Sequence, residues 1–551
     1  MKNYSAGRRR FLQQVSTGAF AVSAANLLRG TSLLAEDVLP PMAGAASQSG
    51  PVRIFVDTRR TISPIDQNLF GSFLEHLGRA IYEGIYDPGS KLADANGFRK
   101  DVLEKIRQLG VPIIRYPGGN FVSSYNWLDG VGPKQSRPHV LDKAWNTIES
   151  NQFGTNEFLA WCKLAGTKPL LGLNFGTGTA EQAAALVEYC NVDHGTKWSD
   201  LRRQHGVADP WKVQHWCLGN EMDGPWQTGH MTASEYGLKA QDAARQMRNV
   251  DPDLKLIACG SSGPFMDTYL EWDREVLEQC YEYVDGLSLH RYLGNSGRDS
   301  GGDSAKYLAL NLSMERQIEE TLAVCDMVRG HKRSPKQLWL SFDEWNVWYR
   351  KTSGSDVDGN RKEAPPLLEE VYNLEDALLV GGLINSLLRH ADRIKIACLA
   401  QLVNVIAPIM TNADGLYQQT IYYPYSWALQ FARGAVLDVL VESSTYPVGG
   451  MDQVAHLDVA GTLDRAGGKL SLFLLNRDLS KSHDLEVVWE DTAPARVMSG
   501  SLLTGEDLKA SNSFAAPKRV VPQTFTAASA SGDRTKFEIP ARSYAVLQWS
   551  M

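Results

Sequence analysis

The stretch LWLSFDEWN, residues 338–346, decides the fold, because it is a short apolar run that ends in acidic residues and an amide. HWCLGNE, residues 215–221, shows the same pattern earlier in the chain. Apolar runs of this length are typical of strands in a parallel sheet that is covered on both faces. Polar residues directly after such strands lie at the carboxyl edge of the sheet, where barrel enzymes build their sites. Both stretches are therefore predicted to be strands that lead into a functional site.

Further apolar runs complete a set of eight predicted strands, at residues 69–75, 112–116, 169–175, 215–220, 256–260, 286–290, 338–343 and 394–401. Between them, apolar residues recur with helical spacing at 101–109, 156–164, 234–247, 308–328 and 375–390. This alternation over residues 65–434 predicts an α/β fold, a closed (β/α)8 TIM barrel. The alternative is an open, doubly wound sheet, which normally carries a Gly-rich phosphate turn after its first strand. Gly71-Ser72-Phe73 supplies no such turn.

The character of the chain changes after residue 434. Residues 453–459, 470–475, 484–488, 537–539 and 545–549 are β-rich or alternate in polarity, and Gly, Ser, Asp and Pro separate them. We therefore predict a C-terminal, jelly-roll-like β-sandwich over residues 435–551, joined by a strand from the N-terminal segment 50–64. A chain of 551 residues is long enough for two such domains.

The amino-acid composition limits the classes of molecule that the protein is expected to bind. A formal net charge of −7 argues against nucleic acid, which proteins bind mainly through clustered Lys and Arg, so we expect no nucleic-acid partner. The 14 Trp and 20 Tyr are compatible with neutral sugars, whose C–H faces stack on aromatic rings. The seven Cys form no CxxC pair and lie in apolar segments, which indicates buried free thiols. No Cys/His group has metal-ligand spacing, so we expect no metal and no other cofactor.

The first 45 residues have the parts of an export signal. Arg8-Arg9-Arg10 precedes a mildly apolar stretch, residues 15–35, and a small-residue run at 43–45. The pattern resembles a twin-arginine leader, although Gly7 and Gln13 stand where other residues are usual. An amphipathic N-terminal helix or a membrane anchor is the alternative. We predict that the protein is exported to the periplasm or to the outside of the cell.

The predicted strand ends carry polar residues that a barrel does not need for stability. Glu221 and Glu344 end the fourth and seventh strands, which a closed barrel brings to one pocket. Breaking a glycosidic bond needs one carboxylic acid to protonate the leaving oxygen and a second carboxylate to face the anomeric carbon. Either glutamate alone is better explained by a surface salt bridge, but the pair favours a glycoside hydrolase. A cation held by these glutamates with Glu75, His76 and His290 is the weaker alternative, because no HExxH spacing supports it.

Longer stretches resemble one family throughout the barrel: GSFLEHLGRAIYEGIYDP (71–88), RYPGGNFVSSYNWLDGVGP (115–133), WCLGNEMDGPWQ (216–227), LSLHRY (287–292), SFDEWNVWY (341–349) and CLAQLVNVIAPI (398–409). In this order they resemble glycoside hydrolase family 51, the retaining α-L-arabinofuranosidases. The resemblance implies release of terminal non-reducing α-L-arabinofuranosyl groups from arabinan, arabinoxylan or arabino-oligosaccharides, without a cofactor. It also implies a possible homo-oligomer, since family members often form hexamers.

The same resemblance implies roles for single residues. Glu221 is similar to the acid/base, Glu344 to the nucleophile and Asn220 to the residue that hydrogen-bonds the sugar 2-OH. The other positions that match the sugar site are His290, Glu75, Asn120, Asn174, Tyr292 and Gln401, with Trp145 and Trp348 as aromatic walls. From the residues alone, Glu75 could instead pair with Arg115, Asn174 could bond loop backbone, and either Trp could belong to the core.

Two other functions stay open on the sequence. Another retaining glycosidase on the same barrel, an endo-glucanase or a xylanase, would require an open groove. A non-catalytic glycan-binding protein would use the sandwich, but it leaves the strand-end glutamates unexplained.

Overall fold

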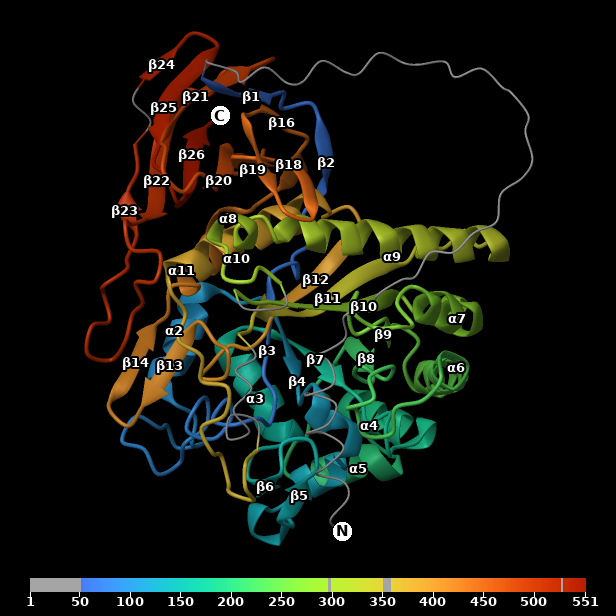
Figure 1. The fold of residues 1–551 in the computed structure, drawn as a ribbon. Coiled ribbons are helices and arrows are strands. Elements are labelled where there is room, and N and C mark those ends of the chain that lie inside the picture. The colour runs from blue at the N-terminus through green and yellow to red at the C-terminus, as the bar shows by residue number, and fades with distance from the viewer. Residues whose placement is uncertain (1–50, 296–298, 350–357, 527–528) are drawn as a thin grey trace, which may run out of the picture. The chain divides into compact units, whose positions relative to one another are not determined.

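The computed structural model describes residues 51–295, 299–349, 358–526 and 529–551 (Figure 1). Eight parallel strands close into a barrel in chain order: β3 (Gly71–Phe73), β4 (Ile113–Tyr116), β7 (Lys168–Gly172), β8 (His215–Leu218), β9 (Lys255–Cys259), β10 (Gly286–Leu293), β11 (Trp339–Val347) and β12 (Ile394–Leu399). Pairing of β12 with β3 closes the ring. Each predicted strand overlaps one of these, so the TIM barrel is confirmed and the open sheet is excluded.

Helices alternate with the barrel strands along the chain: α2 (Lys100–Leu109), α3 (Thr155–Ala165), α4 (Ala180–Asn191), α6 (Ala233–Val250), α7 (Glu271–Cys280), α9 (Asn311–Lys332), α10 (Leu374–Arg389) and α11 (Tyr422–Phe431). The first of them shows the local rules. Val102, Ile106 and Leu109 are buried on one face of α2. Gly110 ends the helix in the left-handed conformation, with a φ of 69°.

The barrel interior is a packed core. Its buried cluster takes one or two side chains from most strands: Phe73, Ile113, Leu170, Cys217, Ile257, Ile396, Cys398 and Ala400. Because these side chains fill the barrel, a substrate site has room only at the rim, where the carboxyl ends of the strands lie. All seven cysteines of the chain are buried and free, as predicted.

Two larger sheets lie outside the barrel. One has the order β16 (Leu440–Glu442), β1 (Val52–Val56), β21 (His483–Trp489), β25 (Arg534–Ile539) and β24 (Ser529–Ser531). The other has the order β2 (Thr61–Pro64), β15 (Ala435–Leu437), β19 (Leu457–Asp464), β20 (Lys469–Asn476), β26 (Ser543–Ser550), β22 (Arg496–Thr504) and β23 (Gln523–Thr524). Ile54, Leu472 and Val487 belong to the buried core that the two sheets share. We propose the boundaries 50–64, 65–434 and 435–551 for the three parts.

One predicted strand, residues 453–459, is divided. Its first part belongs to β18 (Met451–Ala455), which pairs only with β17 (Thr445–Val448) in a separate hairpin, and its second part belongs to β19. His456 stands at the break, and its backbone N–H donates to the carbonyl oxygen of Ser444. Apolar alternation continues through the break, so the sequence pattern does not reveal the change of sheet.

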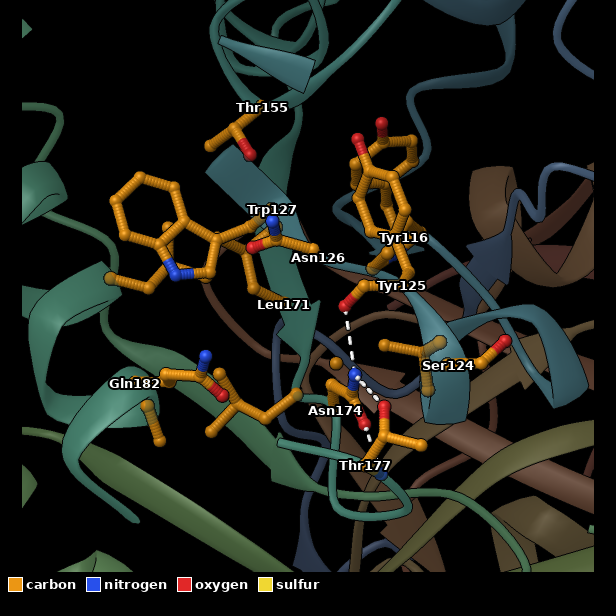
Figure 2. A pocket seen from close by; sticks show the side chains of 16 residues that line it. Tyr116, Ser124, Tyr125, Asn126, Trp127, Thr155, Leu171, Asn174, Thr177 and Gln182 are labelled. Carbon is orange, nitrogen blue, oxygen red and sulfur yellow. Dashed lines mark hydrogen bonds between the residues drawn. The ribbon is translucent and has the colours of Figure 1, made fainter. Parts of the chain in front are cut away.

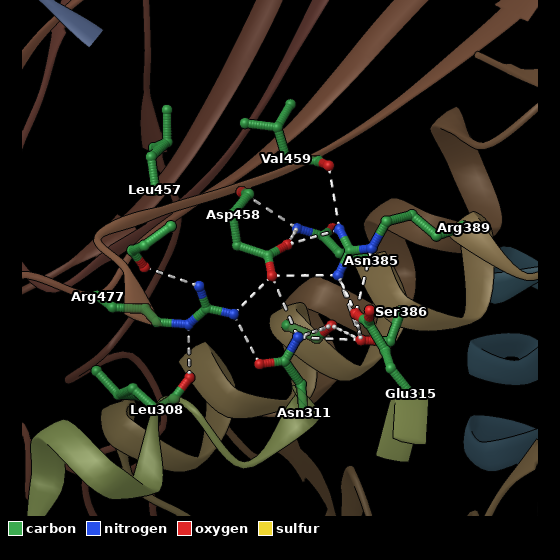
Figure 3. Close-up of polar contacts among 12 residues, drawn as sticks. Leu308, Asn311, Glu315, Asn385, Ser386, Arg389, Leu457, Asp458, Val459 and Arg477 are labelled. Atoms are coloured by element: carbon green, nitrogen blue, oxygen red, sulfur yellow. Dashed lines mark hydrogen bonds and ion pairs between the residues drawn. The ribbon is translucent and has the colours of Figure 1, made fainter. Parts of the chain in front are cut away.

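A buried network of charges joins β19 to the barrel helices (Figure 3). The Asp458 carboxylate accepts from Arg389 of α10 at 2.9 Å and from Arg477 at 2.6 Å. Asn311 of α9 donates to the same carboxylate at 3.2 Å. Burial alone would raise the pKa of Asp458, but the two guanidinium groups hold it well below its usual range. This network adds charged contacts to an apolar interface, because Phe473, Leu475 and Tyr544 of the sandwich belong to the same buried core as the barrel.

The predicted leader, residues 1–45, lies outside the described residues. Within the described ranges, no helix combines the length and the apolar character that crossing a membrane requires.

Candidate active site

Glu344 on β11 lies in the polar cluster at the barrel rim, where it is 6% exposed. The guanidinium of Arg115, on β4, approaches its Oε1 to 2.5 Å through Nη1. The hydroxyl of Tyr292, on β10, donates to its Oε2 at 2.8 Å. Each carboxylate oxygen therefore has a donor, and one donor carries a full positive charge, which orients the carboxylate and stabilises its negative charge.

A β-bulge in β11 turns two adjacent acidic side chains toward the same partner. Between its pairings with Ser288 and His290 of β10, β11 contains one residue more than β10. In a regular strand, neighbouring side chains point to opposite faces. Here Arg115 contacts both Asp343, at 3.3 Å from Nε to Oδ2, and Glu344. The extra residue of the bulge is the physical reason.

Asp343 is fully buried beneath this cluster. Ser288 donates to its Oδ1 at 2.5 Å, and Cys217 donates to its Oδ2 at 3.2 Å. Burial raises the pKa of Asp343, but Arg115 and His290 outweigh burial and lower it to about 2. Asp343 is therefore a permanent negative charge that holds Arg115 in place.

Glu221 follows β8 and faces the same cluster. The indole N–H of Trp226 donates to its Oε2 at 2.6 Å, and His290 Nδ1 lies 3.0 Å from its Oε1. One oxygen of Glu221 and one oxygen of Glu344 lie within 4.8 Å of each other. The φ of Glu221 is 45°, in the left-handed region that non-glycine residues seldom adopt. Such strained backbone is concentrated at active sites.

His290 lies between the acidic side chains. Burial lowers the pKa of His290, but Glu344, Asp343 and Glu221 outweigh burial and raise it to about 10. The imidazole is therefore protonated at neutral pH. Its Nδ1–H points to Glu221, while Nε2 lies 3.6 Å from Asp343. The site thus holds a proton next to Glu221.

Glu75, just after β3, is buried at the same rim. Its Oε1 accepts from the backbone N–H of Phe121 at 2.9 Å and from the indole of Trp145 at 3.0 Å. Burial and the charge of Glu344 raise the pKa of Glu75 to about 8, so it is a neutral acid at pH 7. A Cβ at Gly119 would lie 2.6 Å from Glu75 Oε2, which explains a glycine in this loop.

The remaining polar residues pack around these groups. Asn220 accepts from Arg115 Nη2 at 2.8 Å, and its own amide donates to Asn120 at 3.5 Å. Gln401 accepts from the backbone N–H of Glu75 at 2.9 Å. Arg115 thus pairs with Asp343 and Glu344, in place of the pairing with Glu75 that the sequence left open.

Both predicted aromatic walls contact residues of the cluster. Trp145 bonds Glu75, and the ring of Trp348 meets that of Tyr292 edge to face, with centroids 5.5 Å apart. Both tryptophans are partly exposed. Both also pack against the main apolar core, and their role as walls of the sugar site stays a prediction.

Asn174 differs from the other predicted sugar contacts (Figure 2). Its amide nitrogen donates to the carbonyl oxygen of Tyr125 and to Thr177 Oγ1, both at 2.9 Å. Its amide oxygen accepts from the backbone N–H groups of Thr177 and Gly178. The side chain lines a cavity of about 110 Å³ with Trp127 and Tyr125. These contacts favour the loop-supporting alternative for Asn174.

Sequence reasoning missed two groups of the cluster, Trp226 and Asp343. Both stand inside the quoted motifs, WCLGNEMDGPWQ and SFDEWNVWY. Trp226 could have been found from the sequence, because it stands five residues after Glu221, near enough in the chain for its indole N–H to reach the carboxylate. The sequence gives no such signal for Asp343, because regular strand alternation would point it to the face opposite that of Glu344.

Comparison with known proteins identifies the family. The family model described as alpha-L-arabinofuranosidase 1 domain matches residues 105–299, and the one described as alpha-L-arabinofuranosidase C-terminal domain matches residues 343–543. An intracellular exo-α-(1→5)-L-arabinofuranosidase from Halalkalibacterium halodurans is 48% identical over 83% of this chain and 91% of its own length. The structure of a family 51 α-L-arabinofuranosidase from Bifidobacterium longum matches with a TM-score of 0.87 and 38% identity, over 91% of this chain and 100% of its own. The chain belongs to glycoside hydrolase family 51, the α-L-arabinofuranosidases.

Membership of this family confirms the predicted fold class, whereas the names of four close relatives overturn the predicted export. Four family relatives that are 45–48% identical to this chain, among them one from Bacillus subtilis, are named intracellular exo-α-(1→5)-L-arabinofuranosidases. The prediction of a periplasmic or extracellular enzyme with a twin-arginine-like leader is therefore wrong. It rested on three basic residues before a mildly apolar stretch, a pattern of composition that other N-terminal segments share. A further relative from Bifidobacterium longum, 41% identical over 89% of this chain and 96% of its own length, is named exo-α-(1→6)-L-arabinofuranosidase.

Proposed function

We propose that this family 51 enzyme releases terminal, non-reducing α-L-arabinofuranosyl groups from arabinan, arabinoxylan or arabino-oligosaccharides, with net retention. The observation that carries the proposal is the pair Glu221 and Glu344, which offers two carboxylate oxygens within 4.8 Å. Retaining glycosidases hold their two carboxyl groups about 5–5.5 Å apart, whereas inverting enzymes need roughly 6.5–9.5 Å to admit a water. The short separation supports double displacement.

In the first step, Glu344 is the nucleophile and Glu221 the general acid. Glu344 attacks the anomeric carbon while Glu221 gives its proton to the leaving oxygen, so that a glycosyl ester forms as the glycosidic bond breaks. Arg115 and Tyr292 hold the two oxygens of Glu344 and aim the carboxylate before the sugar arrives.

In the second step, Glu221 is the general base. It takes a proton from water, the water oxygen attacks the anomeric carbon, and the ester bond to Glu344 breaks to release arabinose. The imidazolium of His290, with Nδ1 3.0 Å from Glu221 Oε1, supports both steps by holding a proton next to the acid/base.

The sugar is held by the groups around the pair. We assign Glu75, Asn120, Asn220, Tyr292 and Gln401 to its hydroxyl groups, with Trp145 and Trp348 beside them. Glu75 acts as a neutral donor at pH 7, because burial and the charge of Glu344 raise its pKa to about 8. Asn174 supports the loop that carries this wall of the site.

For the linkage we propose α-(1→5). The four relatives at 45–48% identity carry that linkage in their names, whereas the relative named for α-(1→6) is 41% identical. The homo-oligomer, a hexamer in many family members, stays a prediction.

The deciding experiment is proton NMR of the first product released from a panel of α-L-arabinofuranosides that includes α-(1→5)-arabinobiose and an α-L-arabinofuranosyl-(1→6)-hexose disaccharide, since a (1→6) linkage needs a hexose acceptor. We expect α-arabinofuranose to appear before mutarotation, and faster turnover of the (1→5) disaccharide. A β-configured first product would overturn retention. Cleavage of internal bonds in xylan or cellulose, with little release of arabinose, would favour an endo-glucanase or a xylanase. Binding of the panel without hydrolysis would favour a non-catalytic protein.

A further inference from the structure

A second group of metal-ligand side chains lies in the two-sheet part of the molecule. His456 stands between β18 and β19, Asp478 follows β20, and His483 is the first residue of β21. Among the described residues, only this group and Glu221–His290–Glu344 bring three such side chains within ligand distance of one another. The mechanism of the enzyme uses none of the three.

The geometry is close to three corners of a tetrahedron. His483 Nε2 lies 3.2 Å from Asp478 Oδ2, and His456 Nε2 lies 3.6 Å from the same oxygen. The two imidazole nitrogens lie within 4.8 Å of each other. Tetrahedral zinc with bonds of about 2.0–2.1 Å keeps its ligand atoms roughly 3.3 Å apart. Two of the three separations are therefore near the required value, and the third is at most 4.8 Å.

The surroundings hold each ligand in the orientation that a metal needs. His456 Nδ1 lies 3.0 Å from Ser444 Oγ, which can accept a hydrogen bond from Nδ1–H and so leave the Nε2 lone pair for a metal. The ring of Tyr446 stacks on His456 with centroids 4.8 Å apart. The other oxygen of Asp478, Oδ1, accepts from the backbone N–H groups of Ser480 and Lys481, both at 2.9 Å, so that Oδ2 is left for the imidazoles.

The charge state separates this group from the active-site group. Among the described residues, the Asp478 carboxylate lies within ion-pair distance of the two imidazoles only. At the active site, by contrast, a protonated His290 and the Arg115 guanidinium already balance the acidic side chains. A hydrogen bond between His483 and Asp478 explains the position of one imidazole. It does not explain why His456 Nε2 also faces the same carboxylate oxygen.

We propose that His456, Asp478 and His483 bind a zinc-type divalent ion, with water in the fourth position. Two imidazoles and one carboxylate suit zinc, whereas magnesium and calcium prefer oxygen ligands throughout. The side chains of His456, Asp478 and His483 are 18%, 9% and 15% exposed, which leaves a path for the ion and its water. The ion would tie the β18–β19 junction to the β20–β21 turn, and would stabilise the folded state because the unfolded chain lacks the site.

The test is calorimetric titration of the full chain, freed of metal by chelation, with Zn²⁺ alone. We expect wild type to bind one equivalent more than the double variant H456Q/H483Q, and to gain several degrees in melting temperature with Zn²⁺ but not with Mg²⁺. The active-site group is intact in both proteins, so the difference isolates the proposed site. D478N should weaken the same equivalent at least 10-fold while keeping the turn, because an amide oxygen can still accept at the Oδ1 position.

The matched control is H194Q. His194 forms a similar contact with Asp193, at 2.8 Å, but lacks a second imidazole, and both side chains are largely exposed. We expect H194Q to bind Zn²⁺ like wild type. Equal Zn²⁺ stoichiometry and affinity in wild type and H456Q/H483Q would overturn the proposal, as would the absence of any Zn²⁺-dependent shift in melting temperature. Hydrolysis of arabinofuranosides should be unchanged in all three variants without metal, so the result is independent of the proposed catalytic function.

Discussion

The guanidinium of Arg115 and the carboxylate of Glu344 form a buried ion pair, with 2.5 Å between Nη1 and Oε1 and exposures of 1% and 7% for the two side chains. The same guanidinium contacts Asp343 and Asn220. One cation from β4 thus holds the carboxylate of β11 and the amide that follows β8 in a single arrangement. The contact explains how the barrel positions the proposed nucleophile before substrate binds.

Arg115→Lys should keep the charge and lose the geometry. A lysine ammonium cannot contact Glu344, Asp343 and Asn220 with three nitrogens at once. We expect kcat to fall about 100-fold or more, because small misplacements of a reacting group cost that much, while KM changes little. Arg115→Met, which leaves two acidic groups buried without their partner, should lower the free energy of unfolding by about 3–5 kcal/mol. Equal kcat values for Arg115→Lys and wild type would contradict the positioning role.

Glu344→Ala and Glu221→Ala should lose activity toward different sets of substrates. Without the nucleophile, turnover of every arabinofuranoside should fall by at least ~10³-fold. Without the acid/base, hydrolysis of natural disaccharides should fall by about 10²–10⁴-fold. For 2,4-dinitrophenyl arabinofuranoside, whose leaving group needs no proton, the first step should be spared in Glu221→Ala, seen as a burst of dinitrophenol. Near-normal turnover by Glu344→Ala would remove it from the mechanism.

Glu75→Gln should remove a pH dependence of stability. The pKa of Glu75 is raised from the ordinary 4.5 to about 8, so the unfolded chain ionises it more readily than the folded protein does. Its stabilising contribution is therefore fully present below pH 4.5 and is lost as the pH rises toward 8. A glutamine stays neutral with the same shape, so the variant should match wild type at pH 4 and exceed it in melting temperature at pH 8. Parallel curves for the two proteins would show that folding does not raise the pKa of Glu75.

His290→Gln should flatten the alkaline side of the stability curve. The pKa of His290 is raised from the ordinary 6.5 to about 10 by Glu344, Asp343 and Glu221, against the effect of burial. Its contribution is therefore fully present below pH 6.5 and is lost as the pH rises through 10. The free energy of unfolding, measured in urea from pH 7 to 10, should fall more steeply for wild type than for the variant. Equal slopes would mean that the imidazole is neutral in the folded enzyme.

Asp458→Asn should weaken the attachment of the sandwich to the barrel. The substitution leaves the buried guanidinium of Arg477 without its carboxylate, whereas Arg389 keeps its ion pair with Glu315. Removing one partner of a buried ion pair costs about 3–5 kcal/mol. Asp414→Asn is the control, since its ion pair with Lys91 is 82% and 69% exposed and should be worth at most about 1 kcal/mol. Chemical denaturation of both variants measures the contrast. A similar loss in the two variants would show that the Asp458 network contributes no more than a surface ion pair.

Much of the fold could be predicted because parallel strands leave a strong local signal. The run 338–343, for example, is mostly apolar because the strand is buried on both faces. The network of Asp458 and Arg477 could not be predicted, because their partners lie far away in the chain. The run 453–459 was predicted as one strand, although His456 divides it between a hairpin and a sheet. The export prediction failed because basic residues followed by apolar ones at a terminus do not by themselves distinguish an export signal from another N-terminal segment.

The glutamates at the ends of β8 and β11 were evident from the sequence, because a carboxylate after a buried strand is a local pattern. The retaining mechanism was implied only by the resemblance to family 51. The sequence could not supply their separation, because that depends on barrel closure; the carboxylate oxygens lie within 4.8 Å. Nor could it show that Asp343 and Glu344 share Arg115, because strand alternation separates neighbours and only the bulge against β10 reverses this. Chain order therefore determined which groups reach the rim, and the pairing of strands decided which of them meet.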